Sequence, residues 1–316
     1  MRFAVIRRAF LLLLLCALLV GCEAPNAPTE PTEPATEPTE PPIVAGWQEQ
    51  DGRLYYLCPD GTFATGWQEI DGKPYYLGQT GAMETGWLEQ DGKWYYLLPE
   101  GGLAIGKVNI GGEDCFFTKD GVRFLLVNPW NPISQDYAPE LVELEPDLGY
   151  AGLQVNQACR DALTSMVRDC NAQSGSTVFI VSAYRSLQIQ TYKFNNLLSA
   201  YLYAGYSLED AYALTAREIA VPGTSEHHTG LAADIMDTRY PKLDEVQATV
   251  PGQIWLMENC WRYGFILRYP ADKTEITGII YEPWHYRYVG VELATELYES
   301  GLTLEEYFDE LTMDNG

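Results

Sequence analysis

The stretch that decides the fold is residues 225–234, which read SEHHTGLAAD, together with residues 282–285, which read EPWH. The chain has 316 residues, and these two stretches contain its only histidines, which are His227, His228 and His285. Their concentration in two short motifs argues against scattered surface histidines. The sequence therefore points to one functional site built from both segments.

The residue types in these motifs fit a catalytic zinc site. Zinc takes imidazole and carboxylate ligands, and a catalytic site needs three of them plus an open position for water. His227, Asp234 and His285 supply that number. Glu282 lies three residues before a ligand, close enough to accept a proton from water at the metal. Pro283 follows it and argues against a helix interior, so this is not the helical HExxH arrangement.

The segments around the motifs alternate between helical and strand-like patterns. This predicts an α+β domain over residues 126–316 with a small, mainly antiparallel sheet. Strand-like alternation around His228 predicts a supporting role for it, facing away from the metal. The acidic C-terminal segment is expected to be a solvated helical face. We expect helices at 155–170, 187–203, 208–219, 252–263, 291–298 and 304–311, and strands at 177–182, 231–236, 265–268 and 285–288.

The pattern SxHxxGxAxD followed by Glu-Pro-Trp-His resembles that of the VanY-type D-alanyl-D-alanine carboxypeptidases. These belong to the group of zinc peptidases that includes lysostaphin and hedgehog domains. Further matches are SAYRS at 182–186, GFILRYP at 264–270 and YEPWHYRYVG at 281–290. The resemblance runs from about residue 126 to 306.

This resemblance implies a set of roles for individual residues. One Zn2+ ion would be held by His227, Asp234 and His285, with Glu282 as general base. Arg185 matches the arginine that binds the terminal carboxylate of the substrate, a task suited to its planar fork. Two further positions would help to hold the terminal residue, Ser225 and Gln190.

The implied activity is that of a D,D-carboxypeptidase that removes the terminal D-Ala from peptidoglycan stem peptides. The same chemistry would serve an L,D-carboxypeptidase acting on tetrapeptide stems, and the sequence does not separate the two. A non-catalytic cell-wall binding protein is the alternative from another class. A serine D,D-peptidase is excluded, because no serine in the chain has a lysine three residues later.

Residues 43–125 form four repeats of 20 residues. Gly-Trp recurs at 46–47, 66–67 and 86–87, and Gly106-Lys107 is a degenerate fourth copy. An Asp-Gly pair between aromatic-rich runs indicates a two-residue hairpin turn. A lone hairpin is marginally stable, so the repeats are expected to stack around a shared aromatic core.

These repeats resemble the cell-wall-binding repeats of choline-binding and glucan-binding proteins, in which aromatic cages hold a quaternary ammonium group. The family pattern has an aromatic residue before the Tyr-Tyr pair. Trp94 keeps it, whereas Leu54 and Pro74 do not. At most one cage, with Trp87 and Trp94, is complete. Two interpretations remain open: aromatic residues that only build the stack, or a site for carbohydrate or another cell-wall polymer.

The N-terminal segment is typical of an export signal. Residues 1–21 combine three arginines with a short apolar run, as in a secretory signal peptide. The run ends in Leu19-Val20-Gly21-Cys22, which resembles a bacterial lipobox with a lipidated Cys22. Residues 22–42 are rich in Pro, Thr and Glu and indicate a linker. We therefore expect a lipid-anchored protein on the extracellular face of a bacterial membrane, reaching into the cell wall.

Charge limits the partners. The chain carries 20 basic and 44 acidic side chains, a formal net charge of −24. Such acidity excludes a nucleic-acid backbone as partner and argues against electrostatic docking to anionic lipid, so contact with the membrane is expected only through the lipid anchor. Five cysteines lie beyond the signal and lipobox, without CxxC motifs. An odd number without regular spacing predicts buried free thiols.

Overall fold

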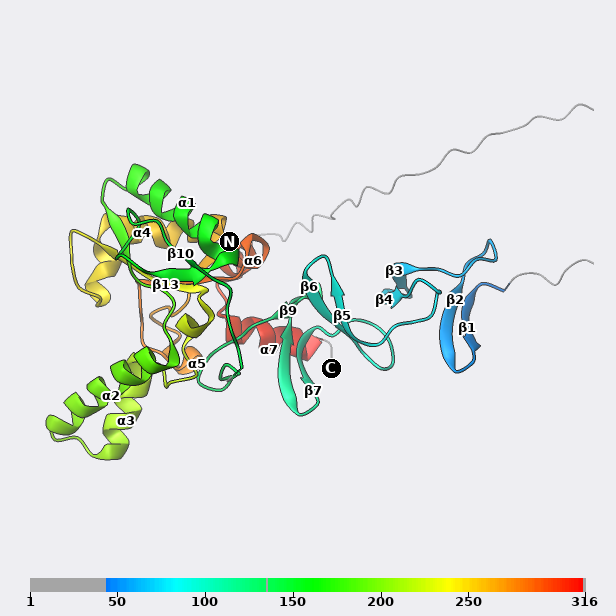
Figure 1. The fold of residues 1–316 in the computed structure, drawn as a ribbon, viewed down its shortest axis with the longest axis horizontal. Coiled ribbons are helices and arrows are strands. Elements are labelled where there is room, and N and C mark those ends of the chain that lie inside the picture. Colours follow the sequence, from blue (N-terminus) through cyan, green and yellow to red (C-terminus); the bar gives the residue numbers. More distant parts are fainter. Residues whose placement is uncertain (1–43, 135, 315–316) are drawn as a thin grey trace, which may run out of the picture. The chain divides into compact units, whose positions relative to one another are not determined.

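The computed structural model describes residues 44–134 and 136–314 (Figure 1). The predicted signal peptide, the lipidation site at Cys22 and the linker lie outside these residues. Within the described ranges, no helix has both the length and the apolar character needed to cross a membrane. The five cysteines in these ranges are free thiols, as predicted, and four of them are buried, whereas Cys58 is only partly buried.

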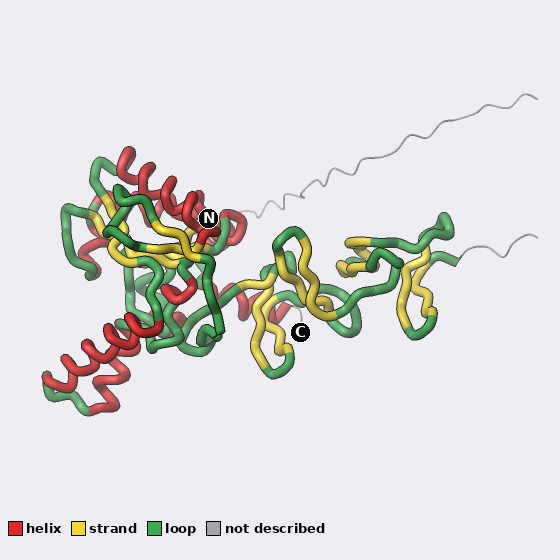
Figure 2. Tube along the Cα trace, in the orientation of Figure 1, coloured by secondary structure: helices red, strands yellow, loops and turns green. Residues whose placement is uncertain are grey.

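The repeats form β-hairpins, as predicted (Figure 2). The first three hairpins turn on the expected Asp-Gly pair, and the fourth turns on Gly111-Gly112; in the first repeat Asp51 has φ 51° and Gly52 has φ 74°. Both turn positions therefore adopt the left-handed conformation that favours this pair. The strands are β1 (Gly46–Gln50), β2 (Arg53–Leu57), β3 (Gly66–Ile70), β4 (Lys73–Leu77), β5 (Gly86–Gln90), β6 (Lys93–Leu97), β7 (Gly106–Ile110), β8 (Glu113–Phe117) and β9 (Arg123–Phe124).

Aromatic contacts join each repeat to the next. The ring centroids of Trp47 and Tyr75 are 4.9 Å apart, and those of Trp67 and Tyr95 are 5.2 Å apart. Both pairs meet edge to face, a favourable arrangement for aromatic rings. Because a two-stranded hairpin cannot bury a core of its own, these contacts provide the shared core that the sequence predicts.

The fourth repeat departs from the others because a helix covers it. The C-terminal helix α7 (Leu304–Asp314) packs on this repeat, with Phe116 and Phe308 in contact at 5.3 Å between ring centroids. The backbone N–H of Lys107 donates to Oγ1 of Thr312 at 2.9 Å. In the strand register, Cys115 and Phe116 occupy the positions of the Tyr-Tyr pair in the first three repeats, and Phe116 is buried against the helix.

The remainder is the predicted α+β domain with a small sheet. Four antiparallel strands follow the order β12-β13-β15-β14, and β10 (Leu141–Glu143) pairs with β11 (Gln154–Asn156). The sheet strands are β12 (Val178–Ser182), β13 (Ala232–Asp237), β14 (Phe265–Leu267) and β15 (His285–Tyr288). The helices are α1 (Gln157–Gln173), α2 (Leu187–Tyr203), α3 (Leu208–Glu218), α4 (Pro251–Asn259), α5 (Thr274–Thr277), α6 (Val291–Ser300) and α7.

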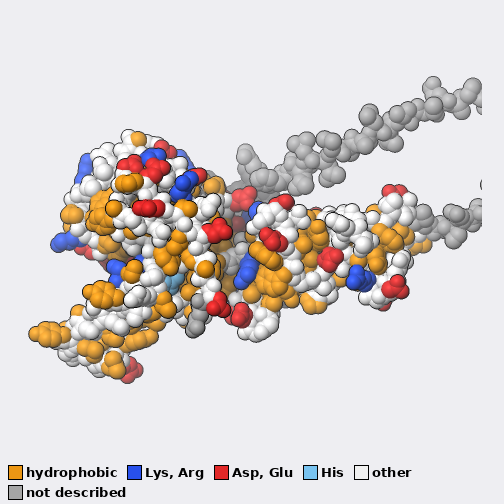
Figure 3. Space-filling view, in the orientation of Figure 1, with side chains coloured by type: hydrophobic (Ala, Val, Ile, Leu, Met, Phe, Trp, Pro, Cys, Tyr) orange, Lys and Arg blue, Asp and Glu red, His pale blue; other side chains and the backbone are white. Residues whose placement is uncertain are grey.

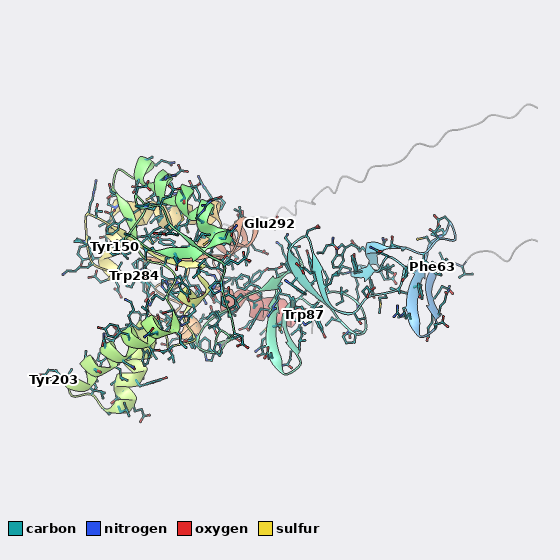
Figure 4. All side chains as sticks on the ribbon, in the orientation of Figure 1. Phe63, Trp87, Tyr150, Tyr203, Trp284 and Glu292 are labelled. Carbon is teal, nitrogen blue, oxygen red and sulfur yellow. The ribbon has the colours of Figure 1, made fainter. Side chains whose placement is uncertain are left out.

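Side chains along β13 and β15 alternate between a hydrophobic core on one face of the sheet and the predicted ligands on the other. Helices α1 and α4 contribute to one core, and Ala233, Ile235 and Tyr286 of the sheet join it. Side chains of successive strand residues point to opposite faces. Asp234 and His285 therefore point away from this core. The helical hairpin of α2 and α3 projects from the domain, with Tyr203 at its tip (Figure 4).

Two expectations about local structure were wrong. Residues Glu226–Thr229 form a 3-10 turn that ends at Gly230 (φ 70°), so the strand-like alternation expected around His228 is absent, and the strand predicted at 231–236 begins only after this turn, as β13. The C-terminal helix is not a solvated acidic face: Leu304, Tyr307 and Phe308 are buried with α6 and Phe116 in a second core. The many acidic residues of this segment obscure its apolar stripe in the sequence. In the structure this stripe packs against both the fourth repeat and the domain.

Candidate active site

Sheet register brings two predicted ligands together. Asp234 on β13 is paired directly with His285 on β15. Nδ1 of His285 lies 3.1 Å from Oδ1 of Asp234, and both side chains are buried. Two residues 51 positions apart in sequence thus meet because their strands are neighbours.

The third predicted ligand comes from the 3-10 turn that precedes β13. Nε2 of His227 lies 3.2 Å from Oδ1 of Asp234. Nδ1 of His227 lies 2.6 Å from the carbonyl oxygen of Ala183, so Nδ1 carries the proton and donates it there. One atom each of His227, Asp234 and His285 lie within 4.8 Å of one another.

The residues present fit a zinc ion. With Nδ1 protonated, His227 presents the lone pair of Nε2 toward Asp234. This buried Nε2 is without a hydrogen-bond partner among the described residues. Two acceptors that face each other at this distance favour a cation between them. Two imidazoles and one carboxylate are a donor set that zinc prefers, and three protein ligands leave a position open.

The charge states of His227 and Asp234 also favour a cation. Burial lowers the pKa of His227 to about 4, so this ring is neutral at pH 7 and can bind metal. Burial opposes the ionised form of Asp234, but His227, His285 and Arg185 hold its pKa well below the usual value. Burial would lower the pKa of His285, yet its hydrogen bonds to Asp234 and Glu226 raise it to about 9.

Glu226 is a functional residue that the sequence analysis missed. Its Oε2 lies 3.4 Å from Nε2 of His285, and its carboxylate is fully buried. Although burial opposes ionisation, Arg268 and Arg287 hold the pKa of Glu226 far below its usual value. A carboxylate that accepts the Nε2 proton fixes the ring so that Nδ1 of His285 faces the site. The sequence did contain a signal for this carboxylate. Arg268 and Arg287 lie in or directly after segments with a strand pattern, so burial of both, and with it a need for buried acidic partners, could have been expected.

Glu282 is placed at the edge of the ligand cluster. It precedes β15, and its Oε2 lies 3.7 Å from Nδ1 of His285. Burial raises the pKa of Glu282 to about 8. A buried carboxylate of this kind is a stronger base than an exposed one, which suits a residue that takes a proton from water.

The predicted substrate-binding residues line a pocket beside the ligands. The pocket has a volume of about 40 Å³ and includes Arg185, Ser225 and Gln190 with Glu282 and both histidine ligands. In Figure 3, histidine atoms (pale blue) show in the hollow between the α2–α3 hairpin and the rest of the domain. The rest of the lining consists of the apolar side chains of Ile219, Ala220 and Ile279 together with Glu218 and Tyr269.

Arg185 is aimed by its neighbours. Its Nη1 donates to Oε1 of Gln190 at 2.8 Å, and its Nη2 lies 3.6 Å from Oδ2 of Asp234. Gln190 is itself held, because its Nε2 donates to the carbonyl oxygen of Ala220 at 2.6 Å. The structure therefore places Gln190 to orient Arg185. Nε of Arg185 is buried without a partner in the described chain, so the guanidinium has a donor to spare for a ligand.

His228 supports this arrangement from outside. Its Nδ1 lies 2.7 Å from the carbonyl oxygen of Arg185, and the N–H of Gly223 donates to its Nε2 at 3.2 Å. The supporting role expected for His228 thus arises from a 3-10 turn, in which it points away from His227, rather than from strand alternation.

Comparison with known proteins identifies the family of this domain. Residues 152–291 match the family VanY, D-alanyl-D-alanine carboxypeptidase. A crystal structure of a mutant of the vancomycin resistance D,D-pentapeptidase VanY in complex with Zn(II) shares 41% sequence identity with a TM-score of 0.51. That match covers 58% of this chain and 97% of the other. The chain belongs to the VanY family of D-alanyl-D-alanine carboxypeptidases.

Two further proteins resemble the VanY domain of this chain. A D-alanyl-D-alanine carboxypeptidase of Enterococcus faecalis is 41% identical over 58% of this chain and 65% of its own length, so the match leaves about a third of that relative uncovered. The solved structure of the LD-carboxypeptidase LdcB is 31% identical, with a TM-score of 0.53, over 65% of this chain and 94% of that one. Ahead of the VanY domain, residues 64–107 match the choline-binding repeat family.

Proposed function

We propose that this chain is a zinc-dependent D,D-carboxypeptidase that removes the C-terminal D-Ala from peptidoglycan stem peptides. The observation that carries the proposal is the position of Arg185. A part-buried guanidinium, whose buried Nε has no hydrogen-bond partner among the described residues, lies in one small pocket with Glu282 and the zinc-ligand set. A carboxylate clamp this close to a hydrolytic centre selects the last residue of a peptide.

The pocket also fits the size of the residue removed. Its apolar side chains, Ile219, Ala220 and Ile279, offer contact for a group as small as a methyl. Arg185 would pair with the terminal carboxylate through two N–H groups. The scissile carbonyl then lies on the side of the zinc ligands.

The residues of the chain divide the chemistry between them. When bound, zinc supplies Lewis acidity, which polarises the scissile carbonyl and makes water easier to deprotonate. Glu282 takes the proton from the attacking water and passes it to the leaving amine. Glu226 and the carbonyl of Ala183 keep the two imidazoles in the tautomers that leave one nitrogen of each for the metal.

The test uses purified protein with stem pentapeptide and tetrapeptide, with and without a chelator, and identifies the products by mass. We expect release of D-Ala from the pentapeptide that stops when zinc is removed and returns when it is restored. Glu282→Gln is expected to abolish turnover while zinc stays bound. Release of D-Ala from neither peptide would refute the proposal, and full activity of Glu282→Gln would show that another residue is the base.

An L,D-carboxypeptidase is the second candidate. It is favoured by the likeness to LdcB, a protein named as an LD-carboxypeptidase. Release of D-Ala from the tetrapeptide alone would establish it. A non-catalytic wall-binding protein would release D-Ala from neither substrate and would still sediment with cell walls.

We also propose that the protein is anchored by a lipid at Cys22 on the extracellular face of the membrane, where its repeats reach a cell-wall polymer. The lipobox-like sequence and the match of residues 64–107 to wall-binding repeats support this. Cys22→Ala is expected to move the protein from the membrane fraction to the medium. Unchanged membrane association of this variant would refute the anchor.

A further inference from the structure

A buried charge cluster lies behind the zinc ligands, and Glu226 is its only member that the proposed chemistry uses. Oε1 of Glu226 accepts from Nε of Arg268 at 2.8 Å and from Nη1 of Arg287 at 3.1 Å. The other oxygen of this carboxylate, Oε2, faces His285. All three members of the cluster are about 1% exposed. One oxygen of Glu226 is thus occupied by arginines, and the other is left for the zinc ligand.

The same cluster extends to the C-terminal helix. Nη1 and Nη2 of Arg268 donate to Oε2 and Oε1 of Glu305 at 2.9 Å and 2.6 Å. This bidentate pair uses the planar forks of both groups, which fixes geometry as well as charge. Nδ2 of Asn128 adds a hydrogen bond to Glu305 at 2.8 Å. A chain of contacts therefore runs from α7 through Arg268 and Glu226 to His285.

The balance of charge explains why each member matters. Two arginines and two glutamates are buried together, so their formal charges cancel. Removing one partner leaves an uncompensated buried charge, and the remaining groups must rearrange around it. Without Glu305, Arg268 would turn toward Glu226 as its only carboxylate. Glu226 would then lose the orientation in which Oε2 accepts the proton of His285.

We propose that Glu305 is a positioning residue of the zinc site. Acting through Arg268, it holds the Glu226 carboxylate in the orientation that accepts the Nε2 proton of His285 and leaves Nδ1 for the metal. The C-terminal helix, whose other face packs on the fourth repeat, therefore completes the metal site. This inference deepens the proposed function and concerns zinc binding rather than turnover.

The test compares Glu305→Gln with Glu306→Gln in the full-length protein. Glu306 is the matched control, because it lies on the same helix and pairs with Lys273 at 2.7 Å without a link to the zinc ligands. We expect Glu305→Gln to weaken Zn2+ affinity, measured by competition with a chelator, by about tenfold or more, as loss of an outer partner typically does. The absorption bands of the Co2+-substituted protein should also shift. Glu306→Gln should leave both readouts unchanged, even where it lowers the melting temperature.

A double mutant tests the route. Glu226→Gln alone should weaken Zn2+ affinity by at least as much as Glu305→Gln, and adding Glu305→Gln to it should cause little further loss. Should Glu305→Gln fail to fold, Glu305→Asp keeps the charge but is too short for both contacts, and a loss of a few-fold is expected. Wild-type Zn2+ affinity in the folded Glu305 variant, equal loss in Glu306→Gln, or additive losses in the double mutant would each overturn the inference.

These outcomes are separate from those for the proposed function. A wild-type protein that binds zinc but hydrolyses neither peptide would end the carboxypeptidase proposal and leave the positioning role to be decided by the affinities. Normal turnover together with unchanged zinc affinity in Glu305→Gln would end the positioning role alone.

Discussion

At the scale of single residues, Arg185 decides whether the enzyme needs a free C-terminus. Its guanidinium is part-buried, is oriented by Gln190 and keeps one buried donor, Nε, unpartnered within the described chain. We expect Arg185→Ala to lower kcat/KM on a pentapeptide by on the order of 100-fold, which corresponds to about 3 kcal/mol for loss of a buried charge pair. Arg185→Lys should recover only part of this, since an ammonium cannot make two parallel hydrogen bonds to a carboxylate.

A peptide with an amidated C-terminus provides the control for this prediction. The wild-type enzyme should prefer the free acid strongly, whereas Arg185→Ala should treat acid and amide alike. The two substrates are compared by kcat/KM under the same conditions. A variant that still prefers the free acid as strongly as wild type would show that another group binds the terminal carboxylate.

The sequence located some site residues and missed others for a physical reason. His227, Asp234 and His285 could be named because zinc restricts its ligands to a few residue types, and histidine is rare in this chain. Glu226 stands next to a ligand, yet its role depends on the 3-10 turn that points three successive side chains in different directions. The partner Arg268 could be matched to the family pattern, but its contacts come from α7, far away in sequence.

At the scale of elements, helix α7 should contribute to the stability of both the fourth repeat and the domain, because it packs against both. Phe308 is 1% exposed and contacts both Phe116 and Phe124 of the fourth repeat. We expect Phe308→Ala to lower the free energy of unfolding by about 3–5 kcal/mol, because truncating a buried phenylalanine removes its burial and leaves a cavity. Denaturant titration followed by fluorescence measures this, since tryptophans lie in both the repeats and the domain.

Met313 on the same helix is the matched control. It is 79% exposed, and Met313→Ala should change the free energy of unfolding by no more than about 0.5 kcal/mol. Equal stability of Phe308→Ala and wild type would mean that α7 is not part of the core that joins repeats and domain.

Elements were predictable where the signal is local. The Asp-Gly turns set the hairpins, because both positions need positive φ, and β15 was predicted at the residues where it lies. The segment 252–263 was read as one helix, but the helix ends at Asn259 and a 3-10 turn follows to Tyr263. The burial of α7 could not be read from its composition, since its partner surface is formed by a repeat almost 200 residues earlier.

At the scale of the whole molecule, the repeats and the α+β domain are joined by helix α7, which packs against both. In the fourth repeat, Lys107 stands in place of the tryptophan and Cys115-Phe116 in place of the Tyr-Tyr pair, and helix α7 packs on it. The tryptophans of the first three repeats remain partly exposed, so they are the candidates for a ligand site. Among these, Trp87 and Trp94 are 41% and 44% exposed and lie 6.3 Å apart between ring centroids.

The chemistry of this pair predicts wall binding that choline does not displace. The guanidinium of Arg123 on β9 lies 5.0 Å from the ring centroid of Trp87, so a cation of the chain already occupies a face of that ring. A quaternary ammonium would have to compete with it. We expect the protein to sediment with purified cell walls, Trp94→Ala to sediment several-fold less, and millimolar choline to release neither. Trp130→Ala is the control, because Trp130 is 59% exposed but lies outside the repeats. Release of the wild-type protein by choline would show that the ammonium displaces Arg123 and that the cage is functional.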